Sequence, residues 1–221
     1  MFSTIARTRM LVLLVPLVLF AAALAISAEE KYPETIIALN GVYLDESRAQ
    51  VRYTAFARKA QEEGYPLIAY FFKALSVSEA IHAKNARDVL CDLGSPPRDE
   101  EFEPEVDTTR ENLKFATTFE INIIENVFPD YLKKITPENH EQAICSLTNE
   151  LETERQHLDL LKKIQRGTGA FFGMLAKRFE GTPVDYFICQ VCGATTIERP
   201  VATCPVCKAD ASRYMTVAKT F

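Results

Sequence analysis

Glutamate and histidine residues recur in two matching sets along the chain, in a pattern that can bind metal ions. Each set has one Glu followed 33 or 34 residues later by a Glu-x-x-His motif: Glu46, Glu79 and His82 in the first, and Glu120, Glu154 and His157 in the second. Side chains three residues apart on a helix point to the same side, so each motif can supply two ligands to one site. The chain has only three histidines, and two of them belong to these motifs.

The residue types in these sets indicate which metals they could bind. Two helices with one Glu each and two helices with a Glu-x-x-His motif provide the ligands of a di-iron carboxylate bundle. Oxygen-rich ligation with one imidazole per metal suits iron or manganese better than a structural zinc. The alternative is that these residues lie on solvated helix faces. We favour metal binding, because the glutamates fall on the core-facing stripes of their helices, where an unpaired carboxylate is costly to bury.

A second metal site is predicted close to the C-terminus. Four of the six cysteines form two Cys-x-x-Cys pairs: Cys189, Cys192, Cys204 and Cys207. Paired turns of this kind converge on one tetrahedral site. Their spacing leaves open whether the metal is iron, which would act as a one-electron relay, or zinc in a structural role. Cys91 and Cys145 are expected to be separate buried thiols, with a disulfide between them as the alternative.

Two predicted helices carry the first set of Glu and His residues. Apolar residues at steps of three and four predict helices over about residues 44–64 and 67–93, separated by a Gly-Tyr-Pro break. The acidic, Pro-containing residues 94–106 follow the second helix. In extended conformation they are long enough to run the length of a helix and start the next one at the other end. The sequence therefore allows a crossover connection.

Two further helices are predicted to carry the second set. The third begins at Asp107 or Thr108 as N-cap, and Pro129 is expected to kink it. The fourth begins at Thr136, with Pro137 at its first helical position. Beyond residue 182 the chain becomes rich in cysteine and includes strand-like patches such as residues 185–188.

The N-terminus has the profile of a signal peptide. Residues 10–27 are almost all apolar, Arg7 and Arg9 precede them, and two glutamates follow. A positive segment, an apolar segment and small residues at its end are typical of export. We therefore expect an exported protein, periplasmic or extracytoplasmic after cleavage. An uncleaved membrane anchor is the alternative, since these residues could just span a bilayer as a helix.

The segments and composition limit the classes of protein to consider. We expect four segments: a signal peptide or anchor (1–28), a four-helix bundle (36–167), a linker or short helix (168–183) and a four-cysteine domain (184–221). The 221 residues are 48% hydrophobic and 25% charged, with a formal net charge of −5. A nucleic-acid partner is therefore not expected, because binding to phosphates needs a surplus of Lys and Arg.

Taken together, the motifs resemble those of rubrerythrins over about residues 36–216. The similar stretches are residues 45–65, 79–84, 111–120 and 154–157, and the terminal cysteines. The resemblance implies an all-α, ferritin-like four-helix bundle that holds two iron ions, with a small C-terminal rubredoxin-like domain. That domain would bind one iron, or zinc, through its four cysteines.

The resemblance also implies an activity and partners. The family's usual reaction is the reduction of hydrogen peroxide to water, with electrons that come from a donor redox protein through the rubredoxin-like centre. Such proteins are commonly homodimers in which the rubredoxin-like domain of one subunit serves the other's di-iron site. Tyr53, which fits the family pattern, is expected to hydrogen-bond a ligand carboxylate. The alternatives are a ferritin-like iron-binding or ferroxidase protein, and an electron-transfer protein without peroxidase turnover.

The third helix departs from the family pattern. Rubrerythrins usually carry a second carboxylate one turn after the third-helix Glu, where this chain has Ile123, and a Tyr where it has Phe128. Counting back from Phe128 and Pro129 would place the two family carboxylates at Ile123 and Asn126 instead. We keep Glu120 as the expected ligand, because its spacing to Glu154 fits the repeat.

Overall fold

The structure is a computed structural model that describes residues 31–168 and 184–219. The expected signal peptide lies outside the described residues, and so does nearly all of the expected linker or short helix. No helix in the described ranges is long and apolar enough to cross a membrane.

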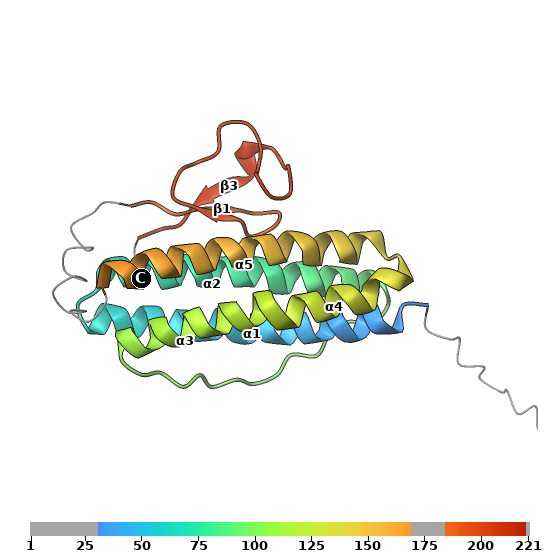
Figure 1. The fold of residues 1–221 in the computed structure, drawn as a ribbon, viewed down its shortest axis with the longest axis horizontal. Helices are drawn as coiled ribbons and strands as arrows, with labels where there is room; N and C mark the ends of the chain where they lie inside the picture. Colours follow the sequence, from blue (N-terminus) through green and yellow to red (C-terminus); the bar gives the residue numbers. More distant parts are fainter. Residues whose placement is uncertain (1–30, 169–183, 220–221) are drawn as a thin grey trace, which may run out of the picture. The chain divides into compact units, whose positions relative to one another are not determined.

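Four long helical segments form the bundle, as predicted (Figure 1). They are α1 (Pro33–Glu62), α2 (Pro66–Asp92), α3 (Thr109–Asn122) continued by η1 (Ile123–Val127) and α4 (Phe128–Ile135), and α5 (Glu141–Thr168). The first helix begins eleven residues earlier than the predicted residue 44, because Leu39, Val42 and Tyr43 continue its buried face. Pro33 is in its first turn, where the missing N–H costs no hydrogen bond.

A long crossover joins α2 to α3. Residues 95–108 have no helix or strand and run along the bundle, so that α2 and α3 point in the same direction (Figure 1). Arg48 and Arg87 hold this segment through ion pairs of 2.6 Å to Glu100 and 2.9 Å to Asp99. The predicted N-cap is Thr108, whose hydroxyl accepts a hydrogen bond from the backbone N–H three residues later.

The third segment is irregular immediately before Pro129. Residues Ile123–Val127 form a π-helical turn (η1), in which the N–H of Phe128 bonds to the carbonyl of Ile123. Pro129 has no N–H to continue the α-helical pattern, which accounts for a break at this point. The sequence predicted the irregularity but not its form, which is a widened turn.

The predicted start of the fourth helix at Thr136 was wrong. Residues Thr136–Glu138 form a 3-10 turn (η2), and Asn139 adopts a left-handed φ of 54° that ends it, so α5 begins at Glu141. The Glu138 carboxylate instead accepts hydrogen bonds of 2.8 and 2.9 Å from the N–H groups of Glu34 and Thr35. It thus satisfies the free donors at the start of α1.

The bundle interior has two apolar clusters with a polar layer between them. One cluster includes Ala49, Leu75, Ala116 and Leu161, and the other includes Val42, Ala83, Ile123 and Leu147. On each long segment the predicted Glu or His ligands stand between the residues of the two clusters. Packing on both sides therefore fixes the level at which these polar side chains meet.

The C-terminal module is a small three-stranded antiparallel sheet. The strands are β1 (Phe187–Cys189), β2 (Thr195–Thr196) and β3 (Tyr214–Thr216), in the order β2-β1-β3, with a short 3-10 turn η3 (Ala211–Arg213) before β3. The register pairs Ile188 with Thr195 and with Met215. This agrees with the predicted fold class of a helical bundle with a small metal-binding domain.

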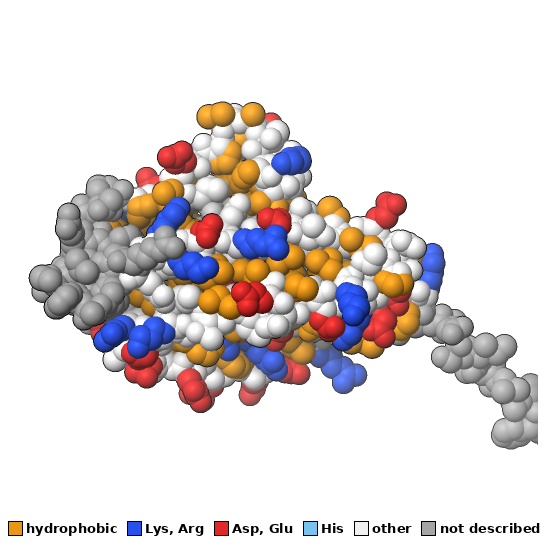
Figure 2. Space-filling model, in the orientation of Figure 1, with side chains coloured by type: hydrophobic (Ala, Val, Ile, Leu, Met, Phe, Trp, Pro, Cys, Tyr) orange, Lys and Arg blue, Asp and Glu red, His pale blue; other side chains and the backbone are white. Residues whose placement is uncertain are grey.

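The surface of the molecule has no large area of one charge on the face shown in Figure 2. Acidic and basic side chains are intermixed there with hydrophobic ones. Many of the charges pair along a helix, such as Lys134 with Asp130 at 2.7 Å.

Candidate metal centres

The structure brings all six predicted Glu and His residues together in the polar layer. They lie on α1 (Glu46), α2 (Glu79, His82), α3 (Glu120) and α5 (Glu154, His157), and none is more than 3% exposed. They form two overlapping groups whose ligand atoms lie within 4.8 Å of one another. One group is Glu46, Glu79, His82 and Glu154, and the other is Glu79, Glu120, Glu154 and His157.

Glu79 and Glu154 belong to both groups, and their geometry is that of bridging carboxylates. His82 Nδ1 lies 2.8 Å from Glu79 Oε2 and 2.9 Å from Glu154 Oε1. His157 Nδ1 lies 3.3 Å from Glu79 Oε1 and 3.0 Å from Glu154 Oε2. Each carboxylate therefore places one oxygen beside each imidazole, so both carboxylates could be shared between two metal ions.

Two threonines set the orientation of the imidazole rings. The Thr153 hydroxyl donates to the carbonyl of Glu150 at 2.7 Å, so at 2.9 Å it accepts a hydrogen bond from His82 Nε2. The Thr195 hydroxyl donates to the carbonyl of Gly193 at 3.0 Å and accepts from His157 Nε2 at 3.3 Å. Nε2 of each ring is thus held as a hydrogen-bond donor, which turns Nδ1 toward the carboxylates.

Buried atoms without a hydrogen-bond partner show that the layer fits metal ions. Glu79 Oε2, His82 Nδ1, Glu120 Oε2 and Glu154 Oε1 are buried and make no hydrogen bond. His82 Nδ1 is close to two of these oxygens but not aligned with them for a hydrogen bond. Buried polar atoms are rarely left in this way. Because they face one another and are all metal-ligand types, two bound cations account for them.

The electrostatics of the layer favour positive charge. Burial and the nearby Glu154 and Glu79 raise the pKa of Glu46 and Glu120 well above the usual range of a carboxyl. Burial alone would lower the pKa of His157, but Glu79 and Glu154 outweigh it and raise that pKa to about 9. Cations that bind here replace protons on these groups.

Tyr53 makes the hydrogen bond that the sequence predicted. Its hydroxyl donates to Glu120 Oε1 at 2.6 Å, and the ring is fully buried. Burial and the adjacent Glu120 raise the pKa of the phenol well above its usual value, so it remains a donor. The bond also supports Glu120, rather than Ile123 or Asn126, as the third-segment carboxylate. Ile123 lies in an apolar cluster, and Asn126 bonds to Asn122 at the surface.

Glu150 is a buried acidic residue in this region that was not predicted from the sequence. It lies four residues before Glu154 on α5 and is 2% exposed. Burial raises its pKa to about 8, although the attraction of His82 opposes this effect. A signal was present, because residue 150 continues the stripe of Ala143, Leu147 and Glu154 at steps of three and four.

The four cysteines of the module also converge. The Sγ atoms of Cys189 and Cys207 are 3.7 Å apart, and so are those of Cys192 and Cys204. A tetrahedron with metal–sulfur bonds of about 2.3 Å has edges of about 3.8 Å, so these distances fit one metal ion. Each Cys-x-x-Cys motif lies in a turn that is closed by a backbone hydrogen bond. The N–H of Gly193 donates to the carbonyl of Cys189, and the N–H of Lys208 donates to the carbonyl of Cys204.

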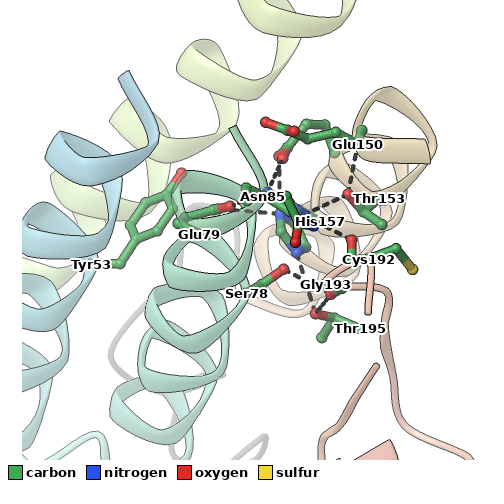
Figure 3. Close-up of polar contacts among 12 residues, drawn as sticks. Tyr53, Ser78, Glu79, Asn85, Glu150, Thr153, His157, Cys192, Gly193 and Thr195 are labelled. Atoms are coloured by element: carbon green, nitrogen blue, oxygen red, sulfur yellow. Dashed lines mark hydrogen bonds and ion pairs between the residues drawn. The ribbon is translucent and has the colours of Figure 1, made fainter. Parts of the chain in front are cut away.

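The module lies directly against the Glu and His layer of its own chain, whereas the resemblance implies that it serves the layer of a partner subunit. The carbonyl of Cys192 is 3.2 Å from His82 Nε2, and the carbonyl of Gly193 accepts a hydrogen bond of 2.7 Å from Ser78 (Figure 3). Gly193 has a φ of 80°, and a Cβ atom at this residue would lie 2.3 Å from His82 Nε2. The close approach therefore depends on a glycine.

The remaining two cysteines differ from the prediction in one respect. Cys91 and Cys145 are free thiols, as favoured, but both are exposed and not buried. Their positions explain the difference, because Cys91 is at the end of α2 and Cys145 is off the apolar stripe formed by Ala143 and Leu147.

Comparisons with known proteins agree with this geometry. A family model described as rubrerythrin matches residues 39–165, which is more than half of the chain. The chain belongs to the rubrerythrin family. A second model, the rubrerythrin rubredoxin-like domain, matches residues 187–215, which contain the four cysteines. The chain therefore has a ferritin-like di-iron site and a rubredoxin-like four-cysteine site.

Relatives within the family are similar over most of their length. Rubrerythrin-2 of Clostridium acetobutylicum is 29% identical over 178 residues, which cover 76% of this chain and 89% of the relative. Nigerythrin of Nitratidesulfovibrio vulgaris is 25% identical over 177 residues, covering 78% of this chain and 81% of the relative. A structure of nigerythrin in the fully reduced, all-ferrous state has the same fold, with a TM-score of 0.71 and 20% identity over 83% of this chain and 86% of that one.

Proposed function

We propose that this protein is an oxidoreductase that reduces hydrogen peroxide to water with electrons relayed through the four-cysteine centre. The observation that carries the proposal is the contact between the backbone of Cys192 and the imidazole of His82, at 3.2 Å. It joins one metal centre to the other through a single hydrogen bond. A structural zinc site would need no such contact with the di-iron layer.

The proposal assigns the ligands by residue. Glu79 and Glu154 would be shared by two irons, with Glu46 and His82 on one side and Glu120 and His157 on the other. When bound, the two ferrous ions supply the two electrons that, with two protons, convert one hydrogen peroxide molecule into two water molecules. An iron in the module would supply electrons to the bundle one at a time. Cys189, Cys192, Cys204 and Cys207 hold its iron.

The protein side chains keep this chemistry in place. Thr153 and Thr195 hold the rings of His82 and His157 with Nδ1 toward the metals, and Tyr53 holds Glu120. The apolar clusters on either side limit access of water to the layer.

A cavity gives a small oxidant a route to this layer. It has a volume of about 260 Å³ and lies between α2, α5 and the module, with Glu150 and Cys192 in its wall. Peroxide is small enough to enter such a space, whereas a bulky organic substrate is not. Asn85, Gln142 and Asn149 contribute polar groups to its lining.

A comparison of oxidants tests the proposed function against its rivals. Protein loaded with iron would be reduced without air and given either hydrogen peroxide or O2 with a continuous electron donor. The proposal expects faster turnover with peroxide and one peroxide consumed per two electrons. Preferential turnover of O2 with retention of ferric iron would indicate a ferroxidase, and no turnover with either oxidant would indicate an electron carrier.

We also propose that the protein is exported and acts as a homodimer. The apolar residues 10–27 support export, and the family resemblance supports the dimer. Protein recovered from the producing cells by fractionation should begin near residue 29, and its mass in solution should be that of two chains. An intact N-terminus in the membrane fraction would indicate an anchor, and a single-chain mass would exclude the dimer.

A further inference from the structure

Glu150 is a buried carboxylate beside the Glu and His layer, outside its two groups of ligand atoms. It lies one helical turn before Glu154, on the same face of α5, and only 2% of its surface is exposed. It is on the side of the layer where Glu46 and His82 are, because its neighbours Leu147 and Leu151 belong to the second apolar cluster, as do Tyr43 and Ala83 next to those two ligands. A carboxylate at such a position is costly unless a charge partner is present.

The contacts of Glu150 point into the layer. The charged groups that act on its carboxyl group are those of His82, Glu154, Glu79 and Glu46, all residues of the layer. Its Oε1 atom is buried and has no hydrogen-bond partner, like the four orphaned ligand atoms described above. Among the described residues, no Lys or Arg forms an ion pair with it. Protein groups therefore leave one of its oxygens unsatisfied.

Charge balance in the layer favours an additional carboxylate. With both imidazoles neutral, the four carboxylates of the six-residue set balance two ferrous ions, but two ferric ions leave two positive charges in excess. An ionised Glu150 removes one of them, in an interior where uncompensated charge is expensive. The residue is thus most valuable in the oxidised form.

We propose that Glu150 is a seventh protein ligand of the di-iron centre, bound to the iron that Glu46 and His82 hold. The additional carboxylate comes from α5, whereas the corresponding part of the third segment carries the apolar residue Ile123. The inference rests on the di-iron site but not on peroxide as the oxidant, so a protein that reduced only O2 would leave it intact.

Mössbauer spectroscopy of protein loaded with ⁵⁷Fe tests this ligand. In Glu150→Gln, we expect the signal of one bundle iron to change while the other bundle iron and the module iron keep theirs. Loss of an anionic ligand should also raise the reduction potential of the bundle and weaken binding of one ferrous ion by about tenfold or more. The matched control is Glu152→Gln, two residues away and exposed, which should behave as the unmodified protein.

A second variant separates ligation from indirect effects. Thr153→Val removes the hydroxyl that holds His82 but keeps every carboxylate, so it should shift the reduction potential less than Glu150→Gln. An unchanged Mössbauer spectrum and potential in Glu150→Gln would overturn the proposal. If that variant does not fold, a crystal structure of the iron-loaded, unmodified protein decides. An oxygen of Glu150 bonded to iron supports the proposal, and a carboxyl that contacts only Glu46 refutes it.

Discussion

The two metal centres are built in opposite ways. All four cysteines of the module lie within 19 residues, and local turns bring each pair together. The Glu and His ligands of the bundle span residues 46–157 and come from four helical segments. The module centre therefore depends on local backbone geometry, whereas the bundle centre depends on how the helices pack. This difference predicts that damage to one centre leaves the other largely intact.

The largest effect is expected from loss of a bridging carboxylate. Glu79→Ala removes an oxygen from both metal positions, so both bundle irons should be lost and peroxide reduction should fall at least about a hundredfold. Metal analysis should drop from about three irons per chain to about one, with the visible spectrum of the module unchanged. The exposed Glu152→Ala is the control. Retention of two bundle irons in Glu79→Ala would contradict the bridging geometry.

Loss of a cysteine in the module should remove the module metal and leave the bundle irons in place. Cys204 is fully buried and accepts a hydrogen bond from Tyr214 at 3.2 Å. Cys204→Ser should abolish the module's visible spectrum and steady-state turnover with a donor protein, while both bundle irons remain. After chemical reduction of its bundle irons, the variant protein should still convert one equivalent of peroxide. If steady-state turnover persists, electrons reach the bundle without the module.

Gly193→Ala tests the contact between the centres. The added Cβ would lie 2.3 Å from His82 Nε2 and 2.8 Å from Ser78 Oγ, so the module should move away and electron transfer should slow by about tenfold or more. The metal content of the module should be unchanged. Gly64→Ala is a matched control, because Gly64 has the same φ of 80° with no atom within 4 Å of the added Cβ. Equal rates in the two variants would show that the contact is not the electron route.

The smallest expected effect is the pH dependence of iron binding by the bundle. Because Glu79 and Glu154 raise the pKa of His157 to about 9 despite its burial, protons compete with iron for Nδ1. Affinity for ferrous iron should rise with pH up to about 9, by about tenfold per pH unit for each proton released. Calorimetry in buffers with different ionisation enthalpies measures the protons released. Release of none between about pH 6 and 9 would exclude the competition.

The sequence predicted the ligands better than the helix limits. Glu-x-x-His and Cys-x-x-Cys spacings are properties of the chain alone, so His157 and Cys204 could be assigned without a structure. The start of α5 could not be predicted, because Glu138 caps the start of α1, about a hundred residues away in the sequence. The contact of Gly193 with His82 likewise depends on packing between distant segments. Glu150 was predictable from its position on the helical stripe.

The most direct test of the account is the fate of module electrons after peroxide is added. Fully reduced, iron-loaded protein would be mixed rapidly with a limiting amount of hydrogen peroxide, and the absorbance of the four-cysteine iron would be followed. The account predicts that the module is reoxidised after the bundle, at a rate independent of protein concentration. A module that stays reduced while peroxide is consumed, or a rate that rises in proportion to protein concentration, would contradict it.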